Sequence, residues 1–384
     1  MPRYDRDDFE ISSSSSRSSS QMPRRAPAPR GRAKKQRNHV RIFVNTICSV
    51  TIVFCTVVLS AIAILGTAPL SRVDIPDNVT GTINKDQINL LVMGYDEAES
   101  LSDIIMVLTM DMKNNKASIL QLPRDTYVDK KKGRYEGTSK INAAYINAPE
   151  GGSIYGASMS LISNDFGIPL DGYISFTLPG FRSMIKSVGG VPIELTKVVR
   201  IKVWEGGYKE GVKIGPGPVV LTSRTAEGFM RNRDYAMGDL DRAYMQRVFY
   251  ASLLKKLMGL GAGDIAKLAI DCYEDVNTNL TLGQMEAYSR KLKDFSMDSI
   301  SIFTLPGQFT EGLKTKSGHD ISLYSIHVDE YVELYNNHIR HYDSPITAEN
   351  VLVREIFKTK ETYTKYEGGS FSEVLDRYNS TGSK

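Results

Sequence analysis

The sequence predicts an α/β domain with three layers, in which helices cover a central mixed sheet, preceded by one transmembrane helix. From residue 88 onward, short apolar runs that end in Gly, Pro or Asp alternate with helical segments. Such alternation is typical of a sheet with helices packed on it. Residues 42–70 contain no Asp, Glu, Lys or Arg, and about 20 apolar helical residues are enough to cross a bilayer core.

The composition excludes several classes of protein. The chain has 384 residues, of which 41% are hydrophobic, 24% charged and 9% aromatic, so it is not collagen-like, a coiled-coil rod or wholly disordered. Residues 1–41 hold 11 basic and 4 acidic side chains, and they account for the net charge of +4. The remaining residues hold 37 basic and 40 acidic side chains. The main body therefore lacks the positive charge typical of nucleic-acid binding, and we expect no nucleic-acid partner.

The uncharged run is predicted to be an uncleaved transmembrane helix, residues 42–68. A cleaved signal peptide is the alternative, but the basic region before the run and the run itself are both too long for one. Eight basic and no acidic residues occupy 22–41, which places the N-terminus in the cytoplasm by the positive-inside rule. We expect a disordered basic cytoplasmic tail (1–41), the span, a linker (69–87) and an extracellular body.

Cysteine usage suits a bacterial cell membrane. Cys48 and Cys55 lie in the predicted span, and Cys272 is the one cysteine beyond it. The outer body therefore has no internal disulfide, which is less typical of a eukaryotic extracellular domain.

Each element of the body follows from a local pattern. Apolar runs bounded by turn residues predict the strands, and the turn at 113–116 joins the second and third strands as a hairpin. Gly and Pro end the helices, and Asp begins the longest one. The predicted strands are 88–94, 104–110, 117–122, 173–176, 191–195 and 299–305, and the predicted helical segments are 140–148, 153–166, 178–188, 223–230, 239–260, 265–272 and 282–295.

Residues 310–384 are predicted to be a C-terminal extension of the main domain, 88–309. They hold four of the five histidines, and the spacing of these histidines fits no standard metal-ligand motif. We expect a solvated tail or a late helix at 329–341 rather than a metal cluster. The histidines are His319, His327, His338 and His341.

Charged and polar residues gather where the predicted strands end. Asp96 follows the first strand and Asp103 precedes the second, so their loop brings two carboxylates to one edge of the sheet. Taken alone, each charged residue suits a solvated surface group or an ion pair as well as it suits a functional site. Together, four arginines, a lysine and the carboxylates suit a polyanion held with a divalent metal. The other members are Arg124 after the third strand, Lys140, Arg231, Arg233, and the trio Asp239, Arg242 and Gln246, which lies on one helix face.

Seven motifs follow one another over about residues 86–305. They are Asp96, Ser102-Asp103, Leu-Pro-Arg-Asp-Thr at 122–126, Lys-Ile-Asn-Ala-Ala-Tyr at 140–145, Gly189-Gly190-Val191, Met-Arg-Asn-Arg-Asp at 230–234 and Gly-Asp-Leu-Asp-Arg…Gln at 238–246. Their order resembles that of the LytR–CpsA–Psr family of bacterial cell-envelope phosphotransferases. A basic tail followed by a single span is also the usual layout of that family.

The resemblance implies a reaction and a site. A glycopolymer (teichoic acid, capsule or another wall polysaccharide) would move from a polyprenyl-pyrophosphate carrier in the cytoplasmic membrane to a peptidoglycan hydroxyl, forming a phosphodiester. The implied metal is Mg²⁺, with Mn²⁺ as the alternative. The implied metal ligands are Asp96 and Asp103; the implied pyrophosphate ligands are Arg124, Lys140, Arg231, Arg233, Arg242 and Gln246; and the implied catalytic residues are Arg124, Asp239 and Arg242.

Some features depart from the family pattern or leave alternatives open. Leu101 and Ile104 flank Ser102-Asp103 where the family commonly has Arg and Thr, which puts the surroundings of the metal in question. Family members bury the lipid between the sheet and its helices, but the apolar faces of segments 154–168, 178–188 and 248–260 equally suit an ordinary core. A hydrolase of the same lipid-linked pyrophosphate and a non-catalytic envelope scaffold or glycan-binding protein are the alternative functions.

Overall fold

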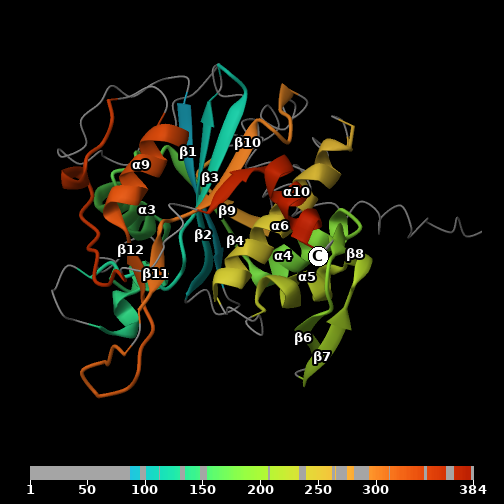
Figure 1. The fold of residues 1–384 in the computed structure, drawn as a ribbon, viewed down its shortest axis with the longest axis horizontal. Coiled ribbons are helices and arrows are strands. Elements are labelled where there is room, and N and C mark those ends of the chain that lie inside the picture. The colour runs from blue at the N-terminus through green and yellow to red at the C-terminus, as the bar shows by residue number, and fades with distance from the viewer. Residues whose placement is uncertain are drawn as a thin grey trace, which may run out of the picture. The chain divides into compact units, whose positions relative to one another are not determined.

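A seven-stranded mixed sheet forms the centre of the computed structural model (Figure 1). β2 pairs antiparallel with both β1 and β3, whereas β4 runs parallel to β1 and β10 parallel to β3. β9 and β13 add antiparallel strands at the two edges. In spatial order the strands are β13 (Gly368–Ser370), β10 (Ile300–Thr304), β3 (Lys116–Gln121), β2 (Ser102–Asp111), β1 (Gln87–Tyr95), β4 (Gly172–Thr177) and β9 (Val276–Thr278).

The structure describes thirteen stretches of the chain, all within the unit Val40–Lys384. The predicted tail, the predicted span and nearly all of the predicted linker lie outside them. Among the described helices, none combines the length and the apolar character that a bilayer span requires. The described residues are 87–95, 101–111, 113–129, 135–147, 154–205, 208–232, 239–261, 264, 275–280, 294–310, 312–340, 344–359 and 367–381.

Both faces of the sheet are buried, because side chains that alternate along each strand enter two different hydrophobic cores. On β1, Leu90 and Val92 belong to the first core, whereas Leu91 and Met93 belong to the second. The first core also contains residues of α4 (Leu178–Ser187), α5 (Ser223–Met230), α6 (Asp239–Met258) and α10 (Phe371–Thr381). The second contains residues of α3 (Ile154–Phe166) and α9 (Val328–His338).

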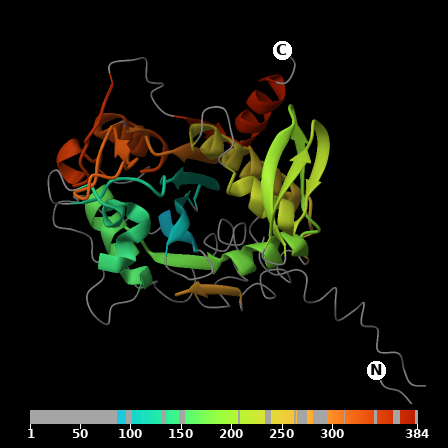
Figure 2. The ribbon, with the colours of Figure 1, turned by 90° about the horizontal axis from the view of Figure 1, so that it is seen from below.

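The two sets of helices lie on opposite sides of the sheet in two perpendicular views (Figures 1 and 2). The predicted α/β domain with a central mixed sheet is therefore confirmed. The predicted hairpin at 113–116 is confirmed as well, since β2 and β3 pair antiparallel across it. α4 begins at the cap Thr177, whose hydroxyl accepts a hydrogen bond from the Gly180 amide. It is followed by Gly189 and Gly190, which both have positive φ angles.

Segment 140–148, predicted as a helical segment, contains the 3₁₀ helix η2 (Ile141–Asn147), and residue 148 lies outside the described residues. A shorter 3₁₀ turn, η1 (Gly137–Ser139), precedes it. The predicted segment 265–272 and all but the last two residues of the predicted segment 282–295 lie outside the described residues.

Three small two-stranded sheets flank the central one. The sequence analysis predicted one of their six strands, β5, and missed the other five. The alternation of apolar and charged residues over 199–205 was a usable signal, whereas two of the other missed strands have only three residues each. The pairs are β5 (Val191–Leu195) with β8 (Gly217–Leu221), β6 (Val199–Glu205) with β7 (Tyr208–Ile214), and β11 (Gly307–Phe309) with β12 (Tyr324–Ile326).

Residues beyond 309, set apart above as an extension, take part in the same packing. β13 pairs with β10 in the central sheet, and α10 contributes Phe371 and Val374 to the first core. The late helix is confirmed as α9, which buries Tyr331 and Leu334 in the second core. The short turn η5 (Ala348–Asn350) follows. The boundary at 309 therefore does not divide the packed body.

Candidate active site

The carboxyl ends of four strands meet at one edge of the central sheet. β1, β3, β4 and β10 run in the same direction, and β2 begins at this edge. Asp103 is the second residue of β2, and Arg124 lies three residues beyond the end of β3. The Arg124 guanidinium donates a hydrogen bond to Oδ1 of Asp103, and both side chains are about three-quarters buried. This edge is the position predicted for the carboxylates and the first arginine.

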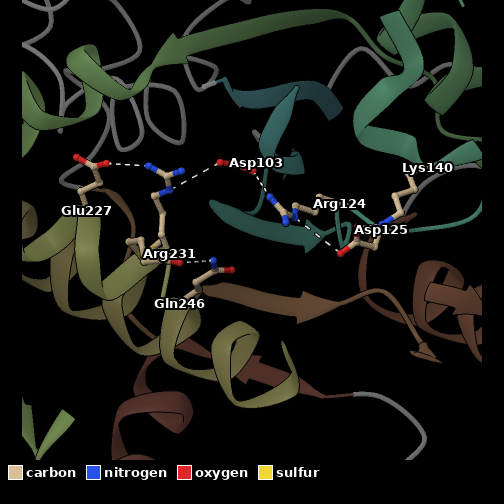
Figure 3. A network of polar contacts seen from close by, with 8 residues as sticks. Asp103, Arg124, Asp125, Lys140, Glu227, Arg231 and Gln246 are labelled. Carbon is tan, nitrogen blue, oxygen red and sulfur yellow. Dashed lines mark hydrogen bonds and ion pairs between the residues drawn. The ribbon is translucent and has the colours of Figure 1, made fainter. Parts of the chain in front are cut away.

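A second arginine approaches Asp103 from the opposite side. Arg231 follows α5, and its Nε lies 3.9 Å from Oδ2 of Asp103. Its guanidinium also contacts the buried Glu227 carboxylate at 3.0 Å, one helical turn away. Glu227 binds Arg182 of α4 at 2.8 Å through its other oxygen. The buried Glu227 carboxylate, which binds both arginines, keeps the Arg231 guanidinium close to Asp103. Figure 3 shows Arg231 between Glu227 and Asp103.

Two further predicted residues come from α6. Arg242 and Gln246 lie one helical turn apart and both line the cavity beside Asp103. The Gln246 amide donates a hydrogen bond of 2.9 Å to the Met230 carbonyl at the end of α5 (Figure 3). This bond joins α5 to α6, so the helices that carry Arg231 and Arg242 keep a fixed spacing.

These side chains surround a cavity of about 380 Å³. Its lining combines charged and apolar side chains. The charged and polar residues include Asp103, Arg124, Glu227, Arg231, Arg242 and Gln246, and the apolar residues include Ile104, Phe176, Leu178, Phe181 and Met230. A cavity lined by both arginines and aromatic or aliphatic groups suits an anion attached to a hydrocarbon.

Lys140 does not line this cavity. Its ammonium forms an ion pair of 2.7 Å with Oδ1 of Asp125, and Oδ2 of Asp125 lies 3.8 Å from Nε of Arg124. Figure 3 shows Glu227, Arg231, Asp103, Arg124, Asp125 and Lys140 as a row of alternating charge. Lys140 thus lies on the far side of Arg124, where it lines a second cavity.

Three predicted site residues are not placed as side chains. Asp96 and Arg233 lie outside the described residues. For Asp239 the structure describes only the backbone, at the first position of α6. Within the described parts of the chain, no group of three or more His, Cys, Asp or Glu side chains is arranged to hold a metal ion. Of the predicted metal ligands, the structure therefore places Asp103 alone.

The sequence analysis missed residues that support the site. Glu227 precedes Arg231 by four positions on a short helix, and this spacing was a usable signal. Arg182 gave no local signal, because its partner Glu227 is 45 residues away. Arg247, one residue after Gln246, is almost fully buried and binds Thr304 on β10 and Oε2 of Glu367, the latter at 2.6 Å. It looked like one more surface charge of a long helix.

The fold and the cavity define a class: α/β proteins with an arginine-lined cavity at one edge of a mixed sheet. The chain belongs to the LytR_cpsA_psr family, whose model matches residues 65–339.

A curated relative and two crystal structures agree with this assignment. The polyisoprenyl-teichoic acid–peptidoglycan teichoic acid transferase TagU of Bacillus anthracis is 30% identical over 266 residues, which cover 65% of this chain and 78% of that protein. TagV of Bacillus subtilis has the same fold, with a TM-score of 0.52 and 22% identity over 64% of this chain and 92% of that one. Protein gbs0355 of Streptococcus agalactiae gives a TM-score of 0.52 and 21% identity, over 73% of this chain and 92% of that one.

Proposed function

We propose that this protein is a phosphotransferase that moves a wall glycopolymer from a polyprenyl-pyrophosphate carrier to a peptidoglycan hydroxyl. Membership of the family supports this proposal, and so does the relative named as a teichoic acid transferase. We extend that activity to the present chain because its cavity has the composition that such a donor needs. Teichoic acid is the polymer favoured by the relatives, with capsule and other wall polysaccharides as alternatives that present the same pyrophosphate.

The observation that carries the proposal is the mixed lining of the first cavity. Arg124, Arg231 and Arg242 line it together with Phe176 and Phe181. Guanidinium groups bind phosphate oxygens with two parallel hydrogen bonds. Aromatic and aliphatic side chains bind the first carbons of a lipid through the hydrophobic effect. A lipid-linked pyrophosphate suits both kinds of side chain.

The reaction is an in-line displacement at the phosphorus that carries the polymer. An oxygen of the acceptor hydroxyl forms a bond to this phosphorus while the bond to the bridging oxygen breaks. The electron pair of that bond stays on the departing lipid monophosphate, and the hydroxyl proton leaves to solvent. Because the transition state is mainly a redistribution of negative charge, catalysis depends on positioning and on cations. Arg124 and Arg231 are held for this role by Asp103 and Glu227.

We also propose that Asp103, with Asp96, holds Mg²⁺ or Mn²⁺ together with the pyrophosphate. The donor type fits, since carboxylate oxygens and substrate phosphates are the usual ligands of Mg²⁺. Both Asp103 oxygens face arginines, and these arginines would turn toward the phosphates when the donor binds. A bound cation supplies additional neutralisation of the pyrophosphate charge.

The N-terminal segment supports a location at the bacterial cell membrane. A basic tail before the uncharged run of residues 42–70 favours a single-pass protein with its body outside. This topology would bring the body to the membrane surface that presents the lipid-linked donor, on the side where peptidoglycan lies.

The experiment uses the purified full-length chain with a short-chain polyprenyl-pyrophosphate disaccharide, Mg²⁺ and uncross-linked peptidoglycan oligomers. Mass spectrometry is expected to detect a sugar–phosphate–glycan adduct that is lost in Arg124→Ala. Release of lipid phosphate without an adduct would assign a hydrolase instead. Donor binding without turnover would assign a scaffold.

A further inference from the structure

A second, larger cavity lies on the far side of Arg124 from the first. Its volume is about 880 Å³, and Arg124 lines both cavities. Among the described residues, Leu101 is the one large apolar side chain in its lining. The polar residues of this lining are Asp125, Glu136, Thr138, Lys140, Asn142 and Lys316, together with Arg124 itself. Its chemistry thus differs from that of the first cavity, whose lining includes several large apolar side chains.

The second cavity is built from two distant parts of the chain. The Ile141 amide donates to the Thr126 carbonyl at 2.8 Å, which fixes the 3₁₀ turns against the segment after β3. The Lys316 amide donates to Oε1 of Glu136 at 3.1 Å, across 180 positions of sequence. Lys316 belongs to the loop between β11 and β12, within the segment first predicted to be an extension. This loop therefore forms part of the cavity rim.

Asn142 is the most informative residue of this lining. It is 6% exposed, and its backbone amide donates to the Arg124 carbonyl at 3.2 Å. Within the described part of the chain, no hydrogen bond engages its side-chain amide. Asn142 lines the cavity, so a ligand bound there can reach its carboxamide. A carboxamide offers one acceptor and two donors, which match the hydroxyl and acetamido groups of a sugar.

We propose that this second cavity binds the glycan of the acceptor, next to the hydroxyl that is phosphorylated. The inference rests on the proposed function and adds a substrate subsite to it. In-line displacement needs the attacking oxygen and the departing oxygen on opposite sides of the phosphorus. With the lipid phosphate in the first cavity, the phosphorus lies beside Arg124 and the acceptor enters from the second. The bond formation, bond breakage and proton release are those described above.

The lining residues divide into those that contact the phosphates and those that contact the glycan. Arg124 belongs to both cavities and acts on the reacting phosphorus. Asn142 and Lys316 lie in the second cavity and contact the acceptor alone. Their loss should weaken acceptor binding without changing donor binding or the attack by water.

The test measures transfer by Asn142→Ala and Lys316→Ala in the full-length chain. Lys316 is exposed and its substitution leaves the core unchanged, so this variant keeps the test valid if Asn142→Ala folds poorly. For each variant we expect the KM for peptidoglycan oligomers to rise on the order of tenfold, as for the loss of a hydrogen bond to a polar ligand. The affinity for the lipid-pyrophosphate disaccharide and the rate of lipid phosphate release without acceptor should stay within about twofold.

The matched control is Lys314→Ala, two positions from Lys316. Lys314 is exposed, pairs with the exposed Asp320 and does not line the cavity, so its variant should behave as wild type. An unchanged acceptor KM in both test variants, with wild-type transfer intact, would overturn the inference. A loss of donor affinity instead would assign this cavity to the sugar of the donor. If the wild-type chain makes no adduct, the proposed function itself fails, and the two failures are thus distinguishable.

Discussion

The guanidinium of Arg124 is hydrogen-bonded to the carboxylate of Asp103, and this pair separates two cavities of different chemistry. Asp103 lines the first cavity, which contains apolar side chains, whereas Arg124 lines both cavities. Neither residue is fully buried, so the pair can exchange its partners for a substrate phosphate. An ion pair at this place keeps the arginine oriented before the substrate arrives, which lowers the reorganisation that the reaction requires.

Arg124→Ala is expected to reduce transfer by about 10²–10³-fold, the loss that follows removal of one electrostatic donor from a transition state. The adduct yield per unit time at saturating donor and acceptor measures this loss. Arg124→Lys keeps the charge but loses the two-pronged geometry, so it should recover part of the rate. A wild-type rate in Arg124→Ala would contradict the assignment of the site.

Arg231 and Arg182 provide a matched pair, because both bind the carboxylate of Glu227. Arg231 lines the first cavity and Arg182 does not. We expect Arg231→Ala to lose at least about tenfold in transfer, since it removes a phosphate contact, and Arg182→Ala to lose no more than about threefold. Steady-state kinetics on both variants decide this. Equal losses would mean that Glu227 and its partners serve the packing of α4 and α5 rather than the chemistry.

The Arg247–Glu367 pair is asymmetric, and its two halves should contribute unequally to stability. The Arg247 side chain is 2% exposed and that of Glu367 is 43% exposed. Glu367→Ala leaves a buried guanidinium without its counter-charge and should lower the free energy of unfolding by about 3 kcal/mol. Arg247→Met leaves a carboxylate that water can reach, so it should cost less. Denaturant unfolding of both variants measures how much free energy of unfolding each one loses. A larger loss in Arg247→Met than in Glu367→Ala would refute the argument.

Acid should destabilise the body partly through His327. Burial lowers the pKa of this imidazole; Glu330 and Glu355 oppose the shift and Lys358 adds to it. The folded state therefore disfavours the protonated ring. The contribution of His327 to stability is complete above the ordinary pKa of about 6.5 and is lost as the pH falls below it.

Unfolding of wild type and of His327→Gln at pH 7.5 and pH 5 measures this effect. The drop in the free energy of unfolding between the two pH values should be smaller in the variant, because glutamine does not titrate. The same pH dependence in His327→Gln and in wild type would show that other groups account for the acid sensitivity.

The parts of the fold with strong local patterns could be predicted from the sequence. The continuous apolar run of β1 and the long amphipathic α6 were placed within two residues of their observed ends. The clusters of site residues were predictable because they follow or precede these strands, and parallel strands bring their ends to one edge of the sheet. Arg124, Arg231, Arg242, Gln246 and Asp103 do gather there.

The remaining features depend on contacts between distant residues. Lys140 follows Arg124 closely in sequence, but its ion pair with Asp125 turns it toward the second cavity. The buried residues of α9 and α10 recur at helical spacing, which predicts an apolar face on each helix but not the surface that covers it. Their burial results from packing on a sheet whose strands lie far away along the chain.

The pairing of β13 with β10, and of β10 with β3, determines when the body can fold. β3 ends at residue 121, but its parallel neighbour begins at residue 300 and the edge strand only at residue 368. A chain that emerges from its N-terminus cannot close the central sheet until almost its last residues are free. Such sequence-distant pairing slows folding. The central sheet therefore stays incomplete until synthesis is almost finished, and a truncation near the C-terminus should leave the sheet edge exposed.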